Sequence, residues 1–228
     1  MFVVNKYIVI FMTNEKILSH VDHTLLRADA TLGEIVKLCD EAVKYKTASV
    51  CIPPSYVRTA REKYPALNIC TVIGFPLGYH TTSAKLSELR QAVSDGANEL
   101  DVVINLGDVK NGNLDAVESE LSELRKTADG KILKVIIETC YLTDDEKIAL
   151  CCIVTRVGVD YIKTSTGFGS GGATLSDIEL FTKHIGNNIK IKASGGIRTR
   201  EAMEMYLNAG CDRLGTSSAV SALIGVAG

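Results

Sequence analysis

Eight short runs of β-branched and other apolar residues recur along the chain, separated by stretches of about a helix's length. The runs cover residues 21–24, 49–52, 68–73, 99–104, 133–137, 161–164, 190–193 and 213–215. Strands that alternate with amphipathic helices are typical of βαβ units, which build parallel sheets. No Pro/Ser-rich linker interrupts the 228 residues, so we predict a single domain spanning 1–228. Eight units favour closure of the sheet into a (β/α)8 barrel, the TIM-barrel fold.

The stretches between the runs carry helix signals. Apolar residues recur on one face of 31–45 and of 82–95, with the spacing of an amphipathic helix. Thr143 precedes three acidic residues, and Thr199 stands just before Glu201. A threonine followed by acids is typical of a helix N-cap, because the acids complement the helix dipole. We therefore predict that helices begin after both threonines.

The formal net charge of −2 and the lack of a basic run argue against nucleic acid or an anionic membrane as partner. A small soluble molecule fits better. Seven cysteines form no C-x-x-C pair, and most of them lie in apolar runs. They are typical of reduced core residues, so we expect a cytoplasmic protein.

The first residues of the chain are apolar but interrupted by Asn5 and Lys6, and they are too short to span a bilayer. Met12 opens a polar and more ordinary beginning. We expect residues 1–11 to form an extension outside the barrel, either an addition from an upstream start or an accessory strand. His20 and His23 have a spacing that metal ligands can use, but no further ligands complete a set. We expect neither a metal nor a cofactor.

Two lysines end neighbouring predicted strands. Tyr161 and Lys163 share one face of their strand and Ile162 occupies the other, so Lys163 is expected to point into the barrel. The alternative is a lysine at the rim, in solvent. Lys192 follows the same pattern on the next strand, which would place the two amines within roughly 5 to 7 Å of each other. Crowded ammonium groups disfavour double protonation, and only a neutral amine attacks a carbonyl.

A carboxylate is expected beside these lysines. Asp101 lies on the fourth predicted strand and faces away from the apolar Leu100 and Val102. A carboxylate inside a barrel requires a partner, and the lysines would supply it. Asp101 could then shuttle protons, or it could form a purely structural salt bridge. Glu99 and Glu138 are expected to be structural or supporting groups.

Glycine-bearing turns follow the last three predicted strands. They contain Gly167, the pair Gly195 and Gly196, and the GTSSAV segment with Ser217 and Ser218. Glycines permit close backbone approach, and free N–H groups at a helix N-terminus attract anions. Barrel enzymes often bind phosphate at these positions. The turns therefore predict a phosphate site, with plain loop closure as the alternative.

Six motifs, in order, resemble those of the deoxyribose-phosphate aldolase family. They are DHTLL at 22–26, ELDVVIN at 99–105, KVIIET at 134–139, DYIKTSTGFG at 160–169, KASGGIR at 192–198 and RLGTSS at 213–218. The resemblance implies a class I aldolase that reversibly cleaves 2-deoxyribose 5-phosphate to glyceraldehyde 3-phosphate and acetaldehyde. It also suggests a homodimer or homotetramer.

The resemblance implies roles for individual residues. Lys163 would form the Schiff base, Lys192 would perturb it, and Asp101 would transfer protons. The remaining matched positions are Gly167, Gly195, Gly196, Ser217 and Ser218 for the phosphate, and Asp22 and Thr24 near the substrate. Cys51 faces the same mouth, where we expect a packed core thiol.

One departure from the family concerns a tyrosine. Many members end in a tail whose terminal tyrosine assists proton transfer, whereas here no tyrosine follows Tyr206 in the sequence given. We expect this to affect the rate and not the class of reaction. Two other hypotheses remain: a different lysine-dependent barrel lyase acting on another sugar or keto-acid phosphate, and a non-catalytic protein that binds phosphorylated sugars.

Overall fold

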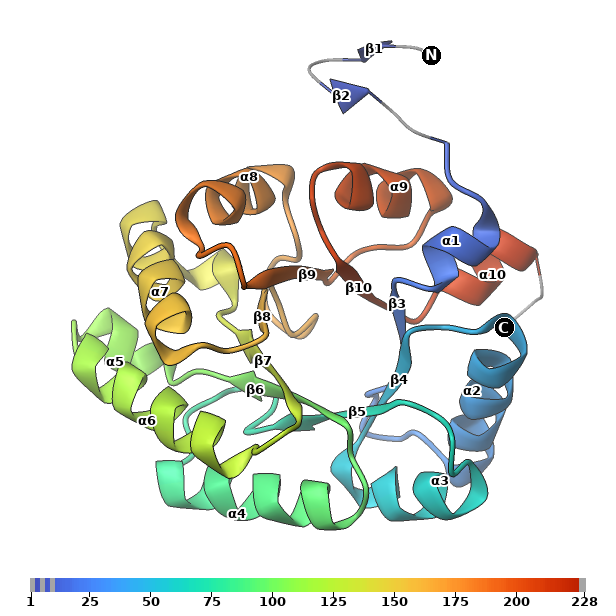
Figure 1. Ribbon diagram of the computed structural model, residues 1–228, viewed down its shortest axis with the longest axis horizontal. Coiled ribbons are helices and arrows are strands. Elements are labelled where there is room, and N and C mark those ends of the chain that lie inside the picture. Colours follow the sequence, from blue (N-terminus) through green and yellow to red (C-terminus); the bar gives the residue numbers. More distant parts are fainter. Residues whose placement is uncertain (1–2, 5–6, 9–10, 226–228) are drawn as a thin grey trace.

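The alternating pattern folds into a closed barrel of parallel strands in the computed structural model, which describes residues 3–4, 7–8 and 11–225. The strands follow the order β10-β3-β4-β5-β6-β7-β8-β9 around the ring (Figure 1). They are β3 (Val21–Thr24), β4 (Ser49–Ile52), β5 (Ile69–Ile73), β6 (Glu99–Val103), β7 (Ile132–Ile136), β8 (Tyr161–Lys163), β9 (Lys190–Ser194) and β10 (Arg213–Thr216). The predicted (β/α)8 fold is confirmed, and each predicted strand end lies within one residue of the observed one.

Helices surround the ring of strands on its outer side (Figure 1). They are α1 (Asn14–Leu18), α2 (Leu32–Tyr45), α3 (Val57–Lys63), α4 (Thr82–Ser94), α5 (Leu106–Lys110), α6 (Leu114–Thr127), α7 (Asp144–Val157), α8 (Leu175–His184), α9 (Arg200–Asn208) and α10 (Ala219–Ile224), with 3-10 turns η1 (Pro54–Tyr56) and η2 (Thr139–Tyr141). Among the described residues, no helix has the length and apolar character needed to cross a membrane.

The predicted caps are present. Thr143 accepts a hydrogen bond from the backbone N–H of Glu146, whose carboxylate accepts one from the N–H of Thr143 in return, forming a capping box. Thr199 accepts from the N–H of Ala202 and caps α9. These bonds satisfy backbone donors that have no partner within the helix.

The two sides of each strand have opposite character. On β6, Leu100 and Val102 face outward into the main hydrophobic core between strands and helices, as does Ile162 on β8. Burying each such side chain contributes about 1.5–3 kcal/mol. The alternate residues Glu99 and Asp101 face the barrel interior and are fully buried. The apolar layer therefore encloses a polar centre.

The N-terminal segment is separate from this ring. Its strands β1 (Val3–Val4) and β2 (Tyr7–Ile8) pair with each other as an antiparallel sheet, and Figure 1 shows them away from the barrel. Residues 1–2, 5–6 and 9–10 of the expected extension lie outside the described residues, as do 226–228 at the C-terminus.

Replacing the cap Thr143 by alanine should lower the free energy of unfolding by about 1 kcal/mol, because the N–H of Glu146 loses its acceptor. Urea unfolding followed by far-UV circular dichroism measures this. Lys183→Ala, on the exposed surface of α8, is the control and should change stability by less than about 0.5 kcal/mol. Equal stabilities for Thr143→Ala and the wild type would show that this cap contributes nothing.

Candidate active site

Asp101 lies at the centre of the barrel and contacts three lysines. Its Oδ2 accepts hydrogen bonds from Lys163 Nζ at 2.7 Å and from Lys192 Nζ at 2.6 Å. Its Oδ1 accepts from Lys134 Nζ at 2.8 Å. These lysines come from β8, β9 and β7, so the closed sheet brings all three side-chain amino groups to one carboxylate. The residues Lys163, Lys192 and Asp101 that the sequence singled out are brought together.

A second layer of charges lies beneath Asp101, toward the amino ends of the strands. Asp22 of β3 contacts Lys192 and the guanidinium of Arg213. Glu99 contacts Lys134 at 2.6 Å and Arg213 at 3.1 Å. All of these carboxylates are fully buried. Each buried charge therefore has partners of opposite sign, which is the condition for keeping ions in a protein interior.

The charges shift one another's pKa values. Burial alone would raise the pKa of Asp101, but Lys134, Lys163 and Lys192 together outweigh it and hold that pKa well below its usual range. Burial opposes the charged form of Lys192 as well, yet Asp101 and Asp22 raise its pKa above the ordinary value. Asp101 therefore stays a carboxylate and Lys192 stays an ammonium group near neutral pH.

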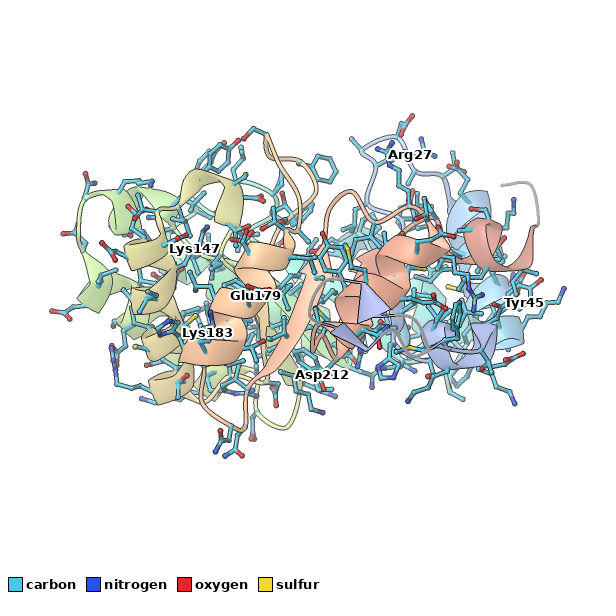
Figure 2. All side chains as sticks on the ribbon, turned by 90° about the horizontal axis from the view of Figure 1, so that it is seen from above. Arg27, Tyr45, Lys147, Glu179, Lys183 and Asp212 are labelled. Atoms are coloured by element: carbon cyan, nitrogen blue, oxygen red, sulfur yellow. The ribbon has the colours of Figure 1, made fainter. Side chains whose placement is uncertain are left out.

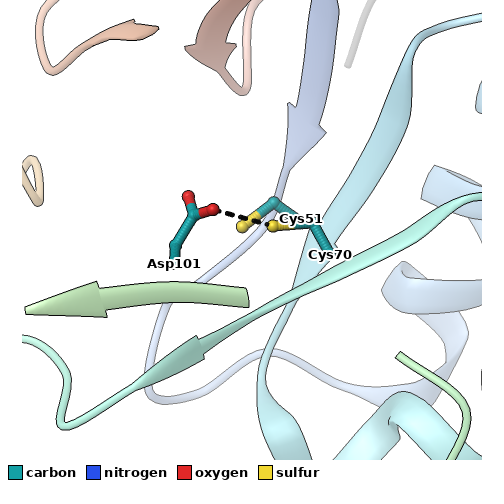
Figure 3. Close-up of side chains that lie close together, drawn as sticks. All are labelled: Cys51, Cys70 and Asp101. Carbon is teal, nitrogen blue, oxygen red and sulfur yellow. Dashed lines mark hydrogen bonds between the residues drawn. The ribbon is translucent and has the colours of Figure 1, made fainter. Parts of the chain in front are cut away.

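Two cysteines adjoin Asp101 from β4 and β5, on the side of β6 away from the lysine strands. Cys51 and Cys70 are neighbours in register on β4 and β5, and Figure 3 shows both thiols next to the Asp101 carboxylate. Cys70 Sγ donates to Asp101 Oδ1 at 3.1 Å and accepts from Lys134 Nζ at 3.2 Å. Burial raises the pKa of Cys70 well above its usual value, so the thiol remains protonated and can donate. Cys51 is buried, in line with the expected core thiol.

These groups also have the spacing of metal ligands. In the described part of the chain, Cys51, Cys70 and Asp101, and likewise Asp22, Cys70 and Glu99, offer ligand atoms within 4.8 Å of one another. The carboxylates already hold ammonium groups, so a metal ion here would meet positive charges at contact distance. These donor sets therefore do not fit a cation.

The histidines considered as ligands lie elsewhere. The His20 ring hydrogen-bonds the carbonyl of Asp212 at 2.8 Å. His23 is buried and pairs with Glu41 of α2 at 2.8 Å. Their rings therefore serve different contacts and do not converge on one point.

A cavity of about 290 Å³ opens above Lys163, at the carboxyl ends of β8, β9, β10 and β3. In Figure 2, Arg27, which lies in the loop after β3, marks this end of the barrel, and Asp212 marks the opposite end. Of the residues singled out from the sequence, the cavity is lined by Thr24, Lys163, Gly167, Gly195, Gly196, Ser217 and Ser218. The turns proposed for phosphate thus share one cavity with the lysine.

Glycine is required where the turns meet. Gly195 has a φ of +85°, and a Cβ there would lie 2.9 Å from the Cα of Gly172. Side chains are rarely accepted at such a φ or at such a distance. The two turns can therefore approach each other only as bare backbone.

Ser218 corrects one expectation. We expected free backbone N–H groups at Ser217 and Ser218, but the N–H of Ser218 donates to Thr216 Oγ1 at 3.0 Å. The threonine hydroxyl two residues earlier competes for that donor, as short side chains often do in turns. The expectation that Ser218 offers a free backbone donor is wrong.

The structure also locates the two first-strand residues. Thr24 lines the cavity, and its hydroxyl donates to the backbone carbonyl of Asp22 at 2.7 Å. The Asp22 side chain does not line the cavity; it lies below, among Lys192, Arg213 and Ser49. Asp22 therefore contacts Lys192 and does not reach the cavity itself.

The chain matches the family model described as DeoC/LacD family aldolase over residues 16–225. It belongs to this aldolase family. The deoxyribose-phosphate aldolase of Clostridium botulinum (strain Alaska E43 / Type E3) is 60% identical over 215 residues, covering 94% of this chain and 97% of that one. The deoxyribose-phosphate aldolase of Clostridioides difficile (strain 630) is 55% identical over 203 residues, covering 89% and 93%.

A solved structure agrees with this placement. The tetrameric deoxyribose phosphate aldolase from Aeropyrum pernix superposes with a TM-score of 0.86 at 34% identity, covering 93% of this chain and 92% of that one. The resemblance read from the motifs is therefore confirmed. The cavity, the lysines and the Asp101 carboxylate all lie within the residues 16–225 that match the family.

Lys134 and Arg213 belong to the same charged network, and the sequence motifs did not single them out. Lys134 is the one charged residue of β7, and Arg213 begins β10. A lone charge within an apolar strand is a signal for an inward-facing ion partner, but it does not reveal which carboxylate it meets. By holding Asp101 Oδ1, Lys134 leaves Oδ2 to Lys163 and Lys192.

The pKa shifts predict how stability depends on pH. The lowered pKa values of Asp22 and Asp101 stabilise the fold above about pH 4, and this contribution is lost as pH falls toward the folded values. Burial also lowers the pKa of His23, so the free energy of unfolding falls further as pH drops below about 6.5, where the unfolded chain binds the proton more readily. The raised values of Lys134 and Lys192 stabilise below about pH 10 and lose their effect above it.

The free energy of unfolding should therefore be highest near neutral and mildly alkaline pH and fall on both sides. Urea unfolding at a series of pH values measures it. A protein that became more stable between pH 5 and pH 3 would contradict the charged network.

Replacing Lys134 by methionine should lower both stability and aldolase activity. The change leaves Glu99 and Asp101 short of a partner, which costs about 3–5 kcal/mol, and it frees Asp101 to move. We expect kcat/KM to fall roughly 10- to 100-fold, because small displacements of a reacting group are costly.

Lys85→Met is the matched control. Lys85 is equally buried and contacts Glu120 at 2.6 Å, but it lies on α4, outside the barrel. The Lys85→Met variant should lose about as much free energy of unfolding as Lys134→Met, but its kcat/KM should stay at the wild-type value. Equal loss of activity in both variants would show that Lys134 acts only through stability.

Proposed function

We propose that this aldolase reversibly cleaves 2-deoxyribose 5-phosphate into glyceraldehyde 3-phosphate and acetaldehyde, through a Schiff base on Lys163. The observation that carries the proposal is the sharing of one Asp101 oxygen by Lys163 and Lys192 below a cavity lined with glycine turns. The names of the relatives support the substrate.

The charges of the network favour a neutral amine. The ion pairs join three carboxylates with four cations, namely Asp22, Glu99 and Asp101 with Lys134, Lys163, Lys192 and Arg213. If one lysine is neutral, three cations face three anions. Arginine does not deprotonate, and Lys163 is the lysine of this set that lines the cavity. Lys163 is therefore the amine that can be neutral and meet a carbonyl.

The reaction follows from these positions. The neutral Lys163 amine attacks C1 of the open-chain sugar, and the resulting carbinolamine loses water after a proton reaches its oxygen, leaving an iminium ion. A base removes the proton of the C3 hydroxyl, the C2–C3 bond breaks, and its electrons form an enamine on Lys163. Glyceraldehyde 3-phosphate leaves. Protonation of the enamine at C2 and hydrolysis then release acetaldehyde and restore the amine.

Asp101 and Lys192 are suited to move these protons. Asp101 already holds a hydrogen bond to the reacting amine, and Lys192 is an ammonium donor on the same oxygen. General acid–base catalysis of this kind contributes roughly 100- to 10,000-fold to a rate. The phosphate of the substrate would lie against Gly167, Gly195 and Gly196, where bare backbone permits close approach, and against Ser217 and Ser218 just before α10.

We further propose that the aldolase is a cytoplasmic homodimer or homotetramer. The relative from Aeropyrum pernix is described as tetrameric. The cysteines of the described chain are free thiols, which suits a reducing compartment.

Borohydride reduction in the presence of acetaldehyde should attach an ethyl group to Lys163, located by peptide mass spectrometry. Lys163→Ala should not be labelled and should lose turnover, because the imine cannot form. Lys183→Ala, on the outer side of α8 (Figure 2), should be labelled like the wild type.

The same assays separate the alternatives. Absence of the label in the wild type would refute the mechanism. Labelling of Lys163 without release of acetaldehyde from 2-deoxyribose 5-phosphate would favour another lysine-dependent lyase. Phosphate binding without any turnover would favour a non-catalytic binding protein.

A further inference from the structure

Glu138 adopts a backbone conformation that its residue type disfavours. It follows β7 and has φ 52° and ψ 67°, in the left-handed region. Among the described residues, Lys46 is the other non-glycine with positive φ, and it forms the C-cap of α2, where this conformation is common. Glu138 caps no preceding helix. Strain of this kind persists where the surroundings enforce it, often beside a functional site.

The carboxylate of Glu138 is buried and directed at the loop between β8 and α8. Its oxygens accept from the backbone N–H of Thr166 at 3.1 and 3.3 Å, and the Thr166 hydroxyl donates to it as well. Thr166 Oγ1 in turn accepts from the N–H of Phe168 at 3.0 Å. These bonds hold the residues on either side of Gly167, whose backbone lines the cavity.

The same loop is packed tightly on both sides. A Cβ on Gly169 would lie 3.1 Å from the Glu138 carboxyl carbon, and one on Gly171 would lie 3.0 Å from Cys140 Cβ. On the other side, a Cβ on Gly172 would lie 2.2 Å from the carbonyl oxygen of Gly195. The loop is therefore held between the turn after β7 and the turn after β9.

Glu138 is also tied to the strand that carries Lys163. The N–H of Ile137 donates to the carbonyl of Lys163 at 3.1 Å, and the N–H of Thr139 donates to that of Thr164 at 2.9 Å. Glu138 lies between these two bonds. The Glu138 side chain does not line the cavity, so its carboxylate lies behind the loop and not inside the cavity.

We propose that Glu138 is a positioning residue that fixes the β8–α8 loop through Thr166, so that Gly167 presents its backbone to the phosphate of the substrate. The inference rests on the proposed function, since it takes this cavity as the phosphate site. Two donors from Thr166 occupy the carboxylate, and the left-handed backbone is what directs it there. Glu138 acts on phosphate affinity and selectivity, and not on imine formation.

Glu138→Gly tests this, because glycine accepts the left-handed backbone while the carboxylate is lost. The dissociation constant of inorganic phosphate, measured by calorimetry, should rise roughly 10- to 100-fold, as for loss of charge-assisted hydrogen bonds. The preference in kcat/KM for 2-deoxyribose 5-phosphate over 2-deoxyribose should fall by a similar factor. Borohydride labelling of Lys163 with acetaldehyde, which has no phosphate, should proceed at the wild-type rate.

Further variants keep the test decisive. Glu138→Gln, which retains the length of the side chain and one oxygen, should recover part of the phosphate affinity. Lys46→Gly relaxes the other left-handed residue, away from the cavity, and should leave the selectivity unchanged. If Glu138→Gly does not fold, Thr166→Val removes the hydroxyl donor, and Thr166→Ser should restore it.

The outcomes separate this inference from the proposed function. Unchanged phosphate affinity in Glu138→Gly, with normal labelling in the wild type, would overturn the role of Glu138 alone. Parallel loss of phosphate affinity and acetaldehyde labelling would also overturn it, because it would indicate general disruption. An unlabelled wild type would refute the Schiff-base proposal, while the phosphate measurements would still decide the role of Glu138.

Discussion

The carboxylate of Asp101 holds the amino groups of lysines from three neighbouring strands inside a closed ring. An isolated carboxylate or ammonium group in this interior would lose several kcal/mol of hydration, so neither sign is stable there without the other. The partners are far apart in sequence and meet because β6, β7, β8 and β9 are consecutive in the barrel. Barrel closure and the charged centre therefore depend on each other.

The interior of the barrel has different character at different depths. Asp22, Glu99 and Arg213 balance charge at the bottom, and Asp101 links this layer to Lys163 at the floor of the cavity. Above the floor, side chains give way to backbone, because the turns carry glycines that approach closely. In the proposed function, the charges prepare the Lys163 amine and the turns provide room for the rest of the substrate. Glu138 connects the two levels, since it joins the Lys163 strand to the loop above it.

Much of this could be predicted from the sequence because strands alternate strictly. A period of two assigns Leu100 and Asp101 to opposite faces, and the same period placed Lys163 and Lys192 inward. Thr143 and Thr199 follow local rules, and both cap helices as predicted. Such features depend on a few neighbouring residues and can be read without a structure.

Other features depend on contacts between distant segments. Lys134 could be seen as a charge in an apolar strand, but its partners come from other strands. Asp22 lies below the cavity because its partners Ser49, Lys192 and Arg213 come from other strands. The N–H of Ser218 is taken by the hydroxyl of Thr216, a contact that the helix-start pattern alone does not reveal. The left-handed backbone of Glu138 has no local signal, because the loop that it holds lies 28 residues further on.

The most direct test of the account is the rate at which acetaldehyde forms an imine on Lys163, followed by rapid mixing and borohydride quench. The wild type and Asp101→Asn are compared after circular dichroism has shown the variant to be folded. In the proposed mechanism Asp101 orders the Lys163 amine and exchanges protons with it, so the account predicts imine formation roughly 100- to 10,000-fold slower in Asp101→Asn. Imine formation at the wild-type rate in a folded Asp101→Asn protein would contradict it.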